Sequence, residues 1–192
     1  MHKQIRIAVI GSRKTSSETM AEMGKVLAAL TRKAIAMGVA VEYTSGACAE
    51  GPDQLQLMLS TVFDNELVTF TAYLPNDRKL WLSKVYPRVK FIVGTDDERH
   101  RATVKELHPA PENLSDYAFE LHGRNLEIIN GQDLKTPVDA VYFSAPENEK
   151  GIVSGGTAMG VSYARLCKVP TFNAFVSDGT DAFIRHVRTL LR

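Results

Sequence analysis

The chain has 192 residues, 44% of them hydrophobic and 23% charged, a balance that excludes wholesale disorder and fits one globular domain spanning residues 1–192. Its 23 basic and 22 acidic side chains leave a formal net charge of +1. This charge argues against a tight, non-specific nucleic-acid binder, because such binding scales with the number of phosphates neutralised. Any phosphate-binding surface must therefore be built locally.

The cysteine content and the hydropathy pattern bear on location and metal binding. Cys48 and Cys167 are far apart and without CxxC spacing, which disfavours both a disulfide framework and a cysteine zinc site. The five histidines show no metal-ligand spacing. Residues 1–6 enter the first apolar run without the core of a signal peptide, and no apolar run reaches about 18 residues. We expect a soluble cytoplasmic protein with no metal and no membrane partner.

The first half of the chain alternates between two periodicities. Short apolar runs predict three buried strands, at residues 5–10, 39–44 and 67–74. Between the first two, apolar residues at helical spacing predict a helix that Ser16 or Ser17 caps and that Gly38 ends. Pro52 suits the first turn of the next helix. This rhythm is what a parallel sheet with crossover helices requires.

The second half repeats the rhythm after a less regular middle. Two strands are predicted, at residues 138–143 and 169–175, and between them a helix that opens at Gly155 and ends near Cys167. Asp178 is expected to cap a final helix that ends at Arg192. The middle predicts a strand, a polar mixed-charge segment, a proline-rich break and a helix, at residues 89–93, 96–107, 108–111 and 114–129.

These elements predict an α/β fold, a single Rossmann-like domain whose mainly parallel sheet carries helices on both faces. The segment at residues 79–111 is interpreted as an insertion into that domain. Ligands of open parallel sheets bind at the carboxyl ends of strands, where the strand order reverses. The loops that follow the predicted strands are therefore the first places to look for function.

The first such loop is Gly11-Ser12-Arg13, which follows the first strand. A glycine there lets backbone N–H groups approach an anion, and the N-terminus of the next helix adds its dipole. The hydroxyl of Ser12 and the guanidinium of Arg13 both suit phosphate. The alternative is a turn glycine followed by a surface arginine.

The second loop runs from Ser45-Gly46-Ala47 through Glu50 to Asp53. Its small side chains allow a tight nest of backbone amides at the end of the second strand. Asp53 is expected either to cap the next helix or to accept a hydrogen bond from a ribose hydroxyl. Glu50 would repel a phosphate, so it should point outward or address a sugar or base.

The third loop, Ser154-Gly155-Gly156-Thr157, opens a helix. Thr157 is expected to cap that helix and to donate to an anion at the same time. The loop is neither a Walker loop nor a GxGxxG dinucleotide pattern. Arg124-Asn125 forms a fourth candidate, in which Arg124 either closes over a phosphate or makes an ordinary surface ion pair.

Two basic segments lie outside these loops. Trp81, Tyr86 and Phe91 alternate with lysines and arginines, a pattern that suits either stacking of single-stranded bases or a buried core. The C-terminal segment carries Arg185, His186, Arg188 and Arg192, a modest basic helix face that either touches a nucleic-acid backbone or is solvated.

The order of the loops resembles the DNA processing protein A (Smf) family. That family opens with a strand and Gly-Ser-Arg, as in Gly11-Ser12-Arg13, and continues with Ser-Gly-x-Ala-x-Gly-x-Asp, to which residues 45–53 are similar with one extra residue. A later Arg-Asn pair and a Ser-Gly-small-Thr helix start look like Arg124-Asn125 and residues 154–157. The resemblance, which spans about residues 5–173, implies a homodimer that binds single-stranded DNA in a basic pocket and helps to load a recombinase.

The chain also resembles the wider group that includes the lonely-guy phosphoribohydrolases, which hydrolyse the N-glycosidic bond of nucleoside monophosphates. Their loop reads Pro-Gly-Gly-x-Gly-Thr-x-x-Glu, and Ser162 stands here in the region of that glutamate. The carboxylates left as catalytic candidates are Glu50, Asp53 and Glu127.

We therefore expect a non-catalytic protein, without a cofactor, that binds a nucleotide or single-stranded DNA through the four loops. One alternative is a nucleoside 5′-monophosphate N-glycosidase that uses one of those carboxylates. The other is a sensor or sequestering protein for a small nucleotide signal.

Overall fold

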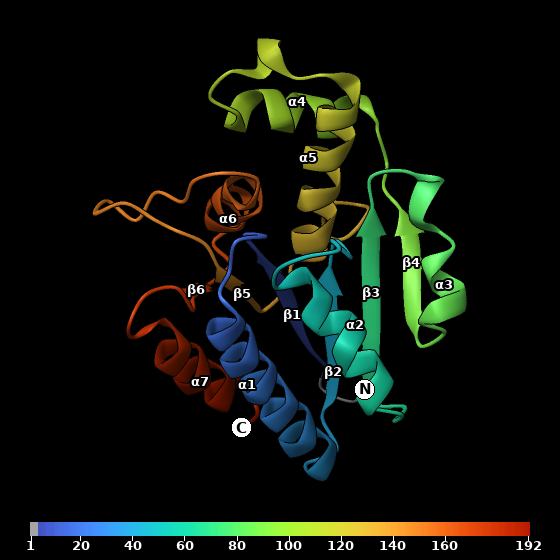
Figure 1. Cartoon of the computed structure of the whole chain (residues 1–192), viewed down its shortest axis with the longest axis vertical. Coiled ribbons are helices and arrows are strands. Elements are labelled where there is room, and N and C mark those ends of the chain that lie inside the picture. The colour runs from blue at the N-terminus through green and yellow to red at the C-terminus, as the bar shows by residue number, and fades with distance from the viewer. Residues whose placement is uncertain (1–3) are drawn as a thin grey trace.

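The structure is a computed structural model that describes residues 4–192; residues 1–3, with His2 and the start of the N-terminal segment, lie outside the described residues. Six strands form one sheet in the order β4-β3-β2-β1-β5-β6, and every neighbouring pair is parallel (Figure 1). The strands are β1 (Gln4–Gly11), β2 (Ala40–Ser45), β3 (Val68–Leu74), β4 (Val89–Val93), β5 (Ala140–Ser144) and β6 (Thr171–Asn173). This confirms the predicted single Rossmann-like α/β domain.

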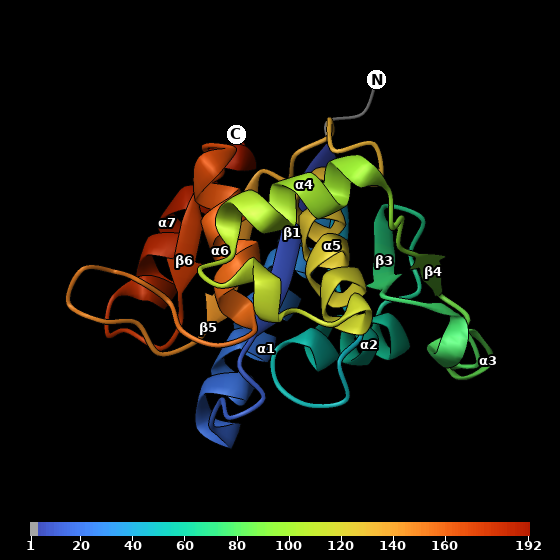
Figure 2. The ribbon, with the colours of Figure 1, turned by 90° about the horizontal axis from the view of Figure 1, so that it is seen from above.

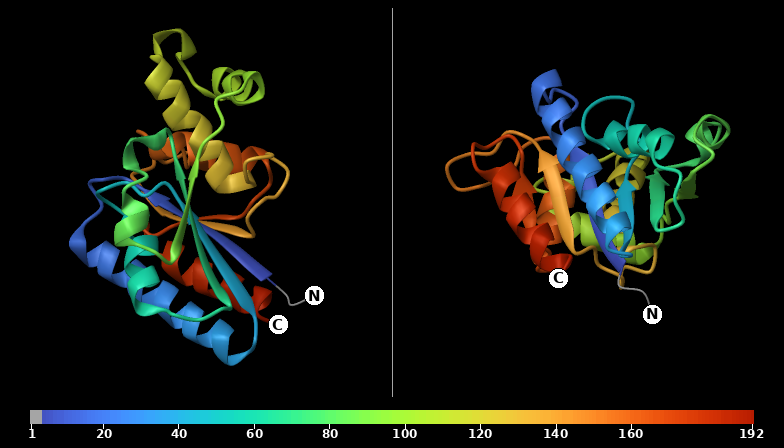
Figure 3. Two further views of the ribbon diagram at one scale, coloured as in Figure 1. Left: turned by 90° about the vertical axis from the view of Figure 1, so that its right-hand side faces the viewer. Right: turned by 90° about the horizontal axis from the view of Figure 1, so that it is seen from below.

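Helices cover both faces of the sheet. α1, α2 and α7 lie on one face, while α5 and α6 lie on the other with α4 packed against α5 (Figures 1 and 2). The helices are α1 (Ser17–Ala36), α2 (Asp53–Val62), α3 (Leu82–Val85), α4 (Glu98–Leu107), α5 (Asp116–Asn130), α6 (Thr157–Leu166) and α7 (Gly179–Leu190), with short 3-10 turns η1 (Asp77–Lys79) and η2 (Pro111–Asn113). Figure 3 shows α1 between α2 and α7 from below, and α4 and α5 extending past the strand ends.

The strand β1 joins the two hydrophobic cores. Ile5, Ile7 and Val9 belong to the core under α1, α2 and α7. Ala8 and Ile10 belong to the core under α5 and α6. Successive side chains of a strand point to opposite faces, so a continuous apolar run is what a strand buried on both faces needs.

The predicted ends of α1 are confirmed. The Ser16 hydroxyl accepts a hydrogen bond from the amide of Thr19, 3.1 Å away, and so caps the first turn. After the helix, Gly38 adopts a positive φ of 67° and its amide donates to the carbonyl of Ile35. A left-handed residue at this position suits glycine, which has no Cβ to clash.

The C-terminal predictions hold less well. The strand expected at residues 169–175 covers only Thr171–Asn173. The final helix ends at Leu190, and Asp178 stands at its start without a capping hydrogen bond. The Asp178 carboxylate instead lies 3.7 Å from the guanidinium of Arg185, further along α7. Asp178 thus stands at the predicted N-cap position of α7, but its side chain does not cap the helix.

The segment at residues 79–111 takes part in the sheet. The strand predicted at residues 89–93 is β4, which pairs with β3 at one edge. The polar stretch after it is largely the helix α4, with His100 and Val104 buried. Trp81 is 59% exposed, whereas Tyr86 and Phe91 pack against the core. Tyr86, just before β4, and Phe91, within it, therefore have a structural role.

No helix within residues 4–192 combines the length and the apolar character that crossing a lipid bilayer demands.

A stack of aromatic rings anchors α7 to the sheet. The rings of Phe183 and Tyr142 are parallel with centroids 4.1 Å apart, and Phe172 meets Phe183 edge-on at 5.7 Å. We expect Phe183→Ala to lower the free energy of unfolding by about 3–5 kcal/mol in urea titrations, because it removes a fully buried ring. In the control Phe175→Ala the lost ring is 56% exposed, and the change should stay within about 0.5 kcal/mol. Equal losses in both variants would contradict this packing.

Candidate functional site

The strand order reverses between β1 and β5, and their carboxyl ends are tied together there. The amide of Ser12 donates to the carbonyl of Ser144 at 2.8 Å. The hydroxyl of Thr15 donates to the carbonyl of Ser12 at 2.8 Å and lies 3.2 Å from the Ser144 hydroxyl. A Cβ on Gly11 would lie 2.7 Å from the Ser144 carbonyl oxygen, so only glycine lets the strands approach this closely. The first predicted loop therefore lies at the carboxyl edge of the sheet where the strand order reverses, which we call the crossover edge.

The loop after β2 folds back onto the loop after β1. A Cβ on Gly11 would also lie 2.4 Å from Cγ of Pro52. A Cβ on Gly51, whose φ is 79°, would lie 2.6 Å from the carbonyl oxygen of Ser12. Ala47 is buried with a φ of 47°, a left-handed backbone that is uncommon for alanine. The first and second predicted loops thus form one packed unit.

The buried carboxylate of Asp53 joins the two loops of this unit, and we call Asp53 with the amides of Gly11 and Gly46 and the side chain of Arg124 the clamp. Its Oδ2 accepts a hydrogen bond from the amide of Gly11 and its Oδ1 accepts one from the amide of Gly46, each at 3.3 Å. The hydroxyl of Ser45 donates to the Asp53 carbonyl at 3.4 Å. Asp53 is 5% exposed and makes no capping bond in α2, so the expectation that it caps that helix is wrong. Because the carboxylate already takes these two amides, neither is free to bind a ligand phosphate.

Arg124, on α5, supplies the positive charge next to this carboxylate. Its Nη1 lies 3.8 Å from Oδ1 of Asp53, its one ion pair within residues 4–192. That distance is too long for a hydrogen bond. The side chain is 10% exposed, and its Nε is buried without a hydrogen-bond partner in the described part of the chain. Arg124 is therefore not the exposed surface arginine that was one of the two expectations for it.

Burial sets the direction of the Asp53 titration. Removal from water raises the pKa of Asp53 above the ordinary value, against the opposing charge of Arg124 and the amides of Gly11 and Gly46. A buried carboxylate of this kind needs its cation. The charge of Asp53 thus depends on the guanidinium of Arg124, in addition to the contact between the two side chains.

Glu127, one turn after Arg124, is fully buried beneath this unit. Its Oε1 accepts a hydrogen bond from the amide of Thr95 at 2.7 Å and lies 3.3 Å from Nε2 of His100. The other ring nitrogen of His100, Nδ1, lies 2.6 Å from Oδ1 of Asp97. Oε2 of Glu127 has no hydrogen-bond partner among the described residues. A chain of charged groups therefore runs from α5 to the start of α4.

The start of α6 forms a second group. Ser154, Gly155 and Gly156 are exposed, and Gly155 has a φ of 76°. Gly156 stands before the helix, and Thr157 is its first residue, so the expectation that Thr157 caps α6 is wrong. Thr157 is 8% exposed.

One turn further into α6, Gly160 connects this helix to the rest of the edge. Its Cβ would lie 2.8 Å from Cδ1 of Ile10 and 4.0 Å from Cβ of Asn125. Ile10 is the next-to-last residue of β1, so α6 begins beside the carboxyl end of that strand. The structure therefore brings Asn125 and the third predicted loop toward the crossover edge.

The remaining candidates differ in exposure. Arg13 is exposed, next to the packed loops. Among the three candidate carboxylates only Glu50 is exposed, whereas Asp53 and Glu127 are buried with partners. No three histidine, cysteine, aspartate or glutamate side chains between residues 4 and 192 gather in a metal-binding arrangement.

Sequence reasoning missed His100, Asp97 and Thr95. Asp97 and His100 belong to the polar segment at residues 96–107, for which the sequence predicts only mixed charge, and Thr95 lies just before it. The only local signal is Asp97, whose carboxylate caps α4 by accepting from the amide of His100 at 2.9 Å. Nothing in the sequence shows that the His100 ring reaches Glu127, because that contact depends on how α4 packs against α5.

No family model, no curated protein and no solved structure matches this chain. The resemblance to DNA processing protein A and the interpretation of residues 79–111 as an insertion therefore stay predictions.

Gly46 provides a steric test of the clamp. A Cβ there would lie 1.7 Å from Nη1 of Arg124, so Gly46→Ala must displace the guanidinium. We expect a loss of about 1–3 kcal/mol in the free energy of unfolding, measured in urea. The matched control is Gly24→Ala in α1, where the nearest neighbour of a Cβ is Leu55 at 3.4 Å. It should gain up to about 1 kcal/mol from helix propensity. A Gly46→Ala protein as stable as the parent would show that Arg124 is not fixed here.

The contact between Asp97 and His100 predicts a pH dependence. Hydrogen bonds from His100 lower the pKa of Asp97. Burial alone would lower the pKa of His100, but its contacts with Glu127 and Asp97 outweigh burial and raise that pKa. The Asp97 contribution is lost as pH falls through its lowered pKa, and the His100 contribution is lost as pH rises through its raised pKa.

We expect Asp97→Asn, which keeps a capping side chain, to be destabilised most near pH 5–6, between the ordinary pKa values of about 3.9 and 6.5. Unfolding free energies of both proteins from pH 3 to pH 9 provide the measurement. A difference that does not vary with pH would contradict the ionic contact.

Proposed function

We propose that this protein binds the phosphate of a nucleotide at the carboxyl edge of its sheet, where the strand order reverses between β1 and β5, and that it acts by binding rather than by catalysis. The observation that carries the proposal is Arg124, a guanidinium 10% exposed whose Nε has no hydrogen-bond partner within residues 4–192. Leaving a buried charged donor unsatisfied is costly, and a phosphate oxygen is a strong acceptor for it. The exposed part of the side chain is where such an acceptor would enter.

Two further features support a phosphate ligand at this edge. Arg13 is exposed beside the loop packed by Gly51, so its guanidinium is available to solvent. The start of α6 carries three exposed small residues, Ser154, Gly155 and Gly156, ahead of a helix whose N-terminal amides carry partial positive charge. Because Asp53 takes the amides of Gly11 and Gly46, the phosphate donors in this proposal are arginines and the α6 terminus.

Charge favours a free nucleotide over single-stranded DNA. The formal net charge of the chain is +1, and a polynucleotide needs several neutralised phosphates along its path. Some of the cations near α4 are already paired, since Arg101 lies 2.6 Å from a carboxylate oxygen of Asp96 and 3.1 Å from one of Asp116. A single nucleotide requires only a few donors.

The N-glycosidase alternative needs a carboxylate beside the sugar. The buried oxygens of Asp53 accept from backbone amides, and Oε1 of Glu127 accepts from Thr95 beneath the clamp. Glu50 is exposed and forms no ion pair within residues 4–192. These contacts favour binding over hydrolysis.

A melting panel tests the proposal. The panel contains nucleoside mono-, di- and triphosphates, cyclic dinucleotides and a single-stranded oligonucleotide. A ligand at about 100 times its Kd stabilises by roughly 2.7 kcal/mol, which raises the Tm of a domain of this size by about 5–10 °C. We expect a shift with at least one nucleotide, and chromatography of the same mixtures should show no free base. A shift with the oligonucleotide alone would redirect the proposal to DNA, and no shift with any compound would overturn it.

Arg13→Ala locates the binding surface without disturbing the fold, because Arg13 is exposed. We expect the best nucleotide from the panel to bind about tenfold or more weakly by calorimetry, since a charged hydrogen bond contributes about 1.5 kcal/mol or more. Arg185→Ala on α7 removes an exposed arginine elsewhere and should leave the Kd unchanged. An unchanged Kd in the Arg13→Ala protein would place the ligand elsewhere.

A further inference from the structure

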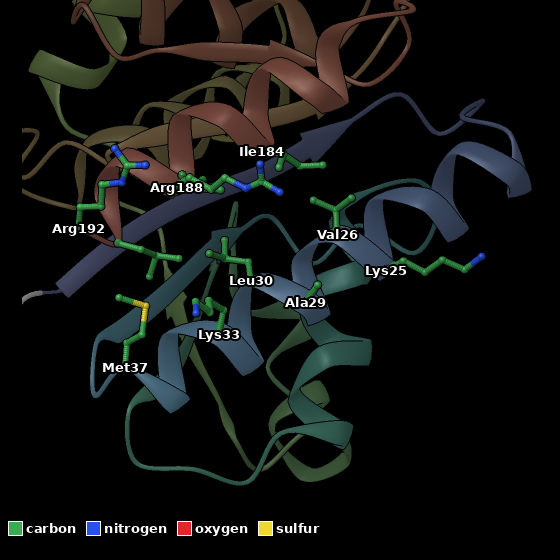
Figure 4. A pocket seen from close by; sticks show the side chains of 11 residues that line it. Lys25, Val26, Ala29, Leu30, Lys33, Met37, Ile184, Arg188 and Arg192 are labelled. Carbon is green, nitrogen blue, oxygen red and sulfur yellow. The ribbon is translucent and has the colours of Figure 1, made fainter.

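A groove runs between α1 and α7, separate from the crossover edge (Figure 4). It encloses a cavity of about 640 Å³. Seven of its lining residues are apolar: Val26, Ala29, Leu30, Met37, Ile184, Val187 and Leu191. They come from the middle and C-terminal parts of both helices, whereas the crossover edge lies at the start of α1. The groove is therefore a second feature of the fold, independent of the proposed nucleotide site.

The other four lining residues are all basic: Lys25, Lys33, Arg188 and Arg192. All four are exposed, and none forms an ion pair within residues 4–192. Among the described residues, none of those that line the groove is acidic. Of the basic C-terminal residues that the sequence indicated, Arg188 and Arg192 line this groove. Arg185 lies near Asp178, and the His186 ring lies against Phe172.

The cations are spread along the groove. Lys25 and Lys33 are eight positions apart on α1, about 12 Å along the helix axis at 1.5 Å per residue. Arg188 and Arg192 stand one turn apart at the end of the other wall. A ligand that pairs with all four basic side chains needs negative charges at several points along its length, beside an apolar surface.

We infer that this groove binds an amphipathic helix of a partner protein, with its apolar face on the groove floor and acidic side chains along its flanks. Helices commonly lie in apolar grooves with anchors at positions i, i+3, i+4 and i+7. Acidic side chains on the helix would be attracted by the basic residues on both walls of the groove, and this attraction would steer the encounter.

Other occupants fit the groove less well. A symmetric dimer of this chain would bring the same four cations from each copy against one another, because a twofold interface uses the same surface twice. Single-stranded nucleic acid stacks its bases on aromatic side chains, and no aromatic residue of the described part of the chain lines the groove. A fatty acid carries one charged head, whereas these cations extend over about 12 Å of α1.

The test uses three synthetic peptides of about 18 residues, five helical turns, with a fluorophore at one end. The first has leucine at i, i+3, i+4 and i+7 with glutamate on both flanks. The second replaces each glutamate by lysine, and the third replaces each leucine by serine. We expect the first to bind the full-length protein in anisotropy titrations at least about tenfold more tightly than either of the others, and more weakly as salt rises.

Charge reversal in the protein ties this binding to the groove. Lys33→Glu combined with Arg188→Glu should weaken binding of the acidic peptide at least about fivefold, the scale of exposed ion pairs. The matched control is Lys84→Glu combined with Lys105→Glu, which makes the same change of charge at exposed positions on α3 and α4. Circular dichroism checks that both double variants keep their fold, and the control should bind as the parent does.

Three results would overturn the inference: no binding of the acidic peptide, equal binding of the acidic and basic peptides, or equal weakening by both double variants. Sedimentation of the protein alone, with and without the groove substitutions, tests whether a second copy of this chain occupies the groove. Self-association that the groove substitutions abolish would also overturn the inference, since it assigns the groove to a second copy. None of these readouts involves a nucleotide, so they stand apart from the outcome at the crossover edge.

Discussion

The carboxylate of Asp53 holds together the carboxyl edge of the sheet at β1 and β2. It accepts from the amides that end two neighbouring strands, at Gly11 and Gly46, in a position where it is 5% exposed. Such a buried charge persists only beside a cation, and Arg124 provides one from the opposite face of the sheet. The loops after β1 and β2, the start of α2 and the helix α5 are therefore constrained by one ionic contact.

The same contact changes how the roles of the glycines in these loops are interpreted. Gly11, Gly46 and Gly51 resemble a phosphate cradle in sequence, yet each is needed for steric reasons, because an added Cβ would lie within 2.7 Å of Pro52, Arg124 or Ser12. Two of their amides serve an internal carboxylate. In the proposal, what this edge offers a ligand is the guanidinium of Arg124, whose Nε has no hydrogen-bond partner within residues 4–192. The proposed anion binding thus depends on a side chain that lies beside Asp53.

The sequence predicted the sheet well because its signals are local. The double-sided apolar run of β1, the Ser16 cap and the left-handed Gly38 each depend on a few neighbouring residues. Predictions for Asp53 and Thr157 as helix caps failed because each is the first residue of its helix and the cap position falls one residue earlier. Asp178 does stand at the cap position of α7, but its carboxylate lies near Arg185 and makes no capping hydrogen bond. The contacts of Arg124 with Asp53, and of His100 with Glu127, join segments distant in the sequence. Periodicity and spacing carry no information about such pairs.

The most direct measurement of the central claim is the Arg124 Nε–H resonance in a two-dimensional nitrogen–proton NMR spectrum, assigned by its loss in Arg124→Lys. Nε has no protein partner within residues 4–192, so a bound phosphate should change its environment. The account predicts a saturable shift of this resonance during titration with a nucleotide, at the concentrations that raise the Tm. A resonance that stays unchanged while the nucleotide binds would contradict it.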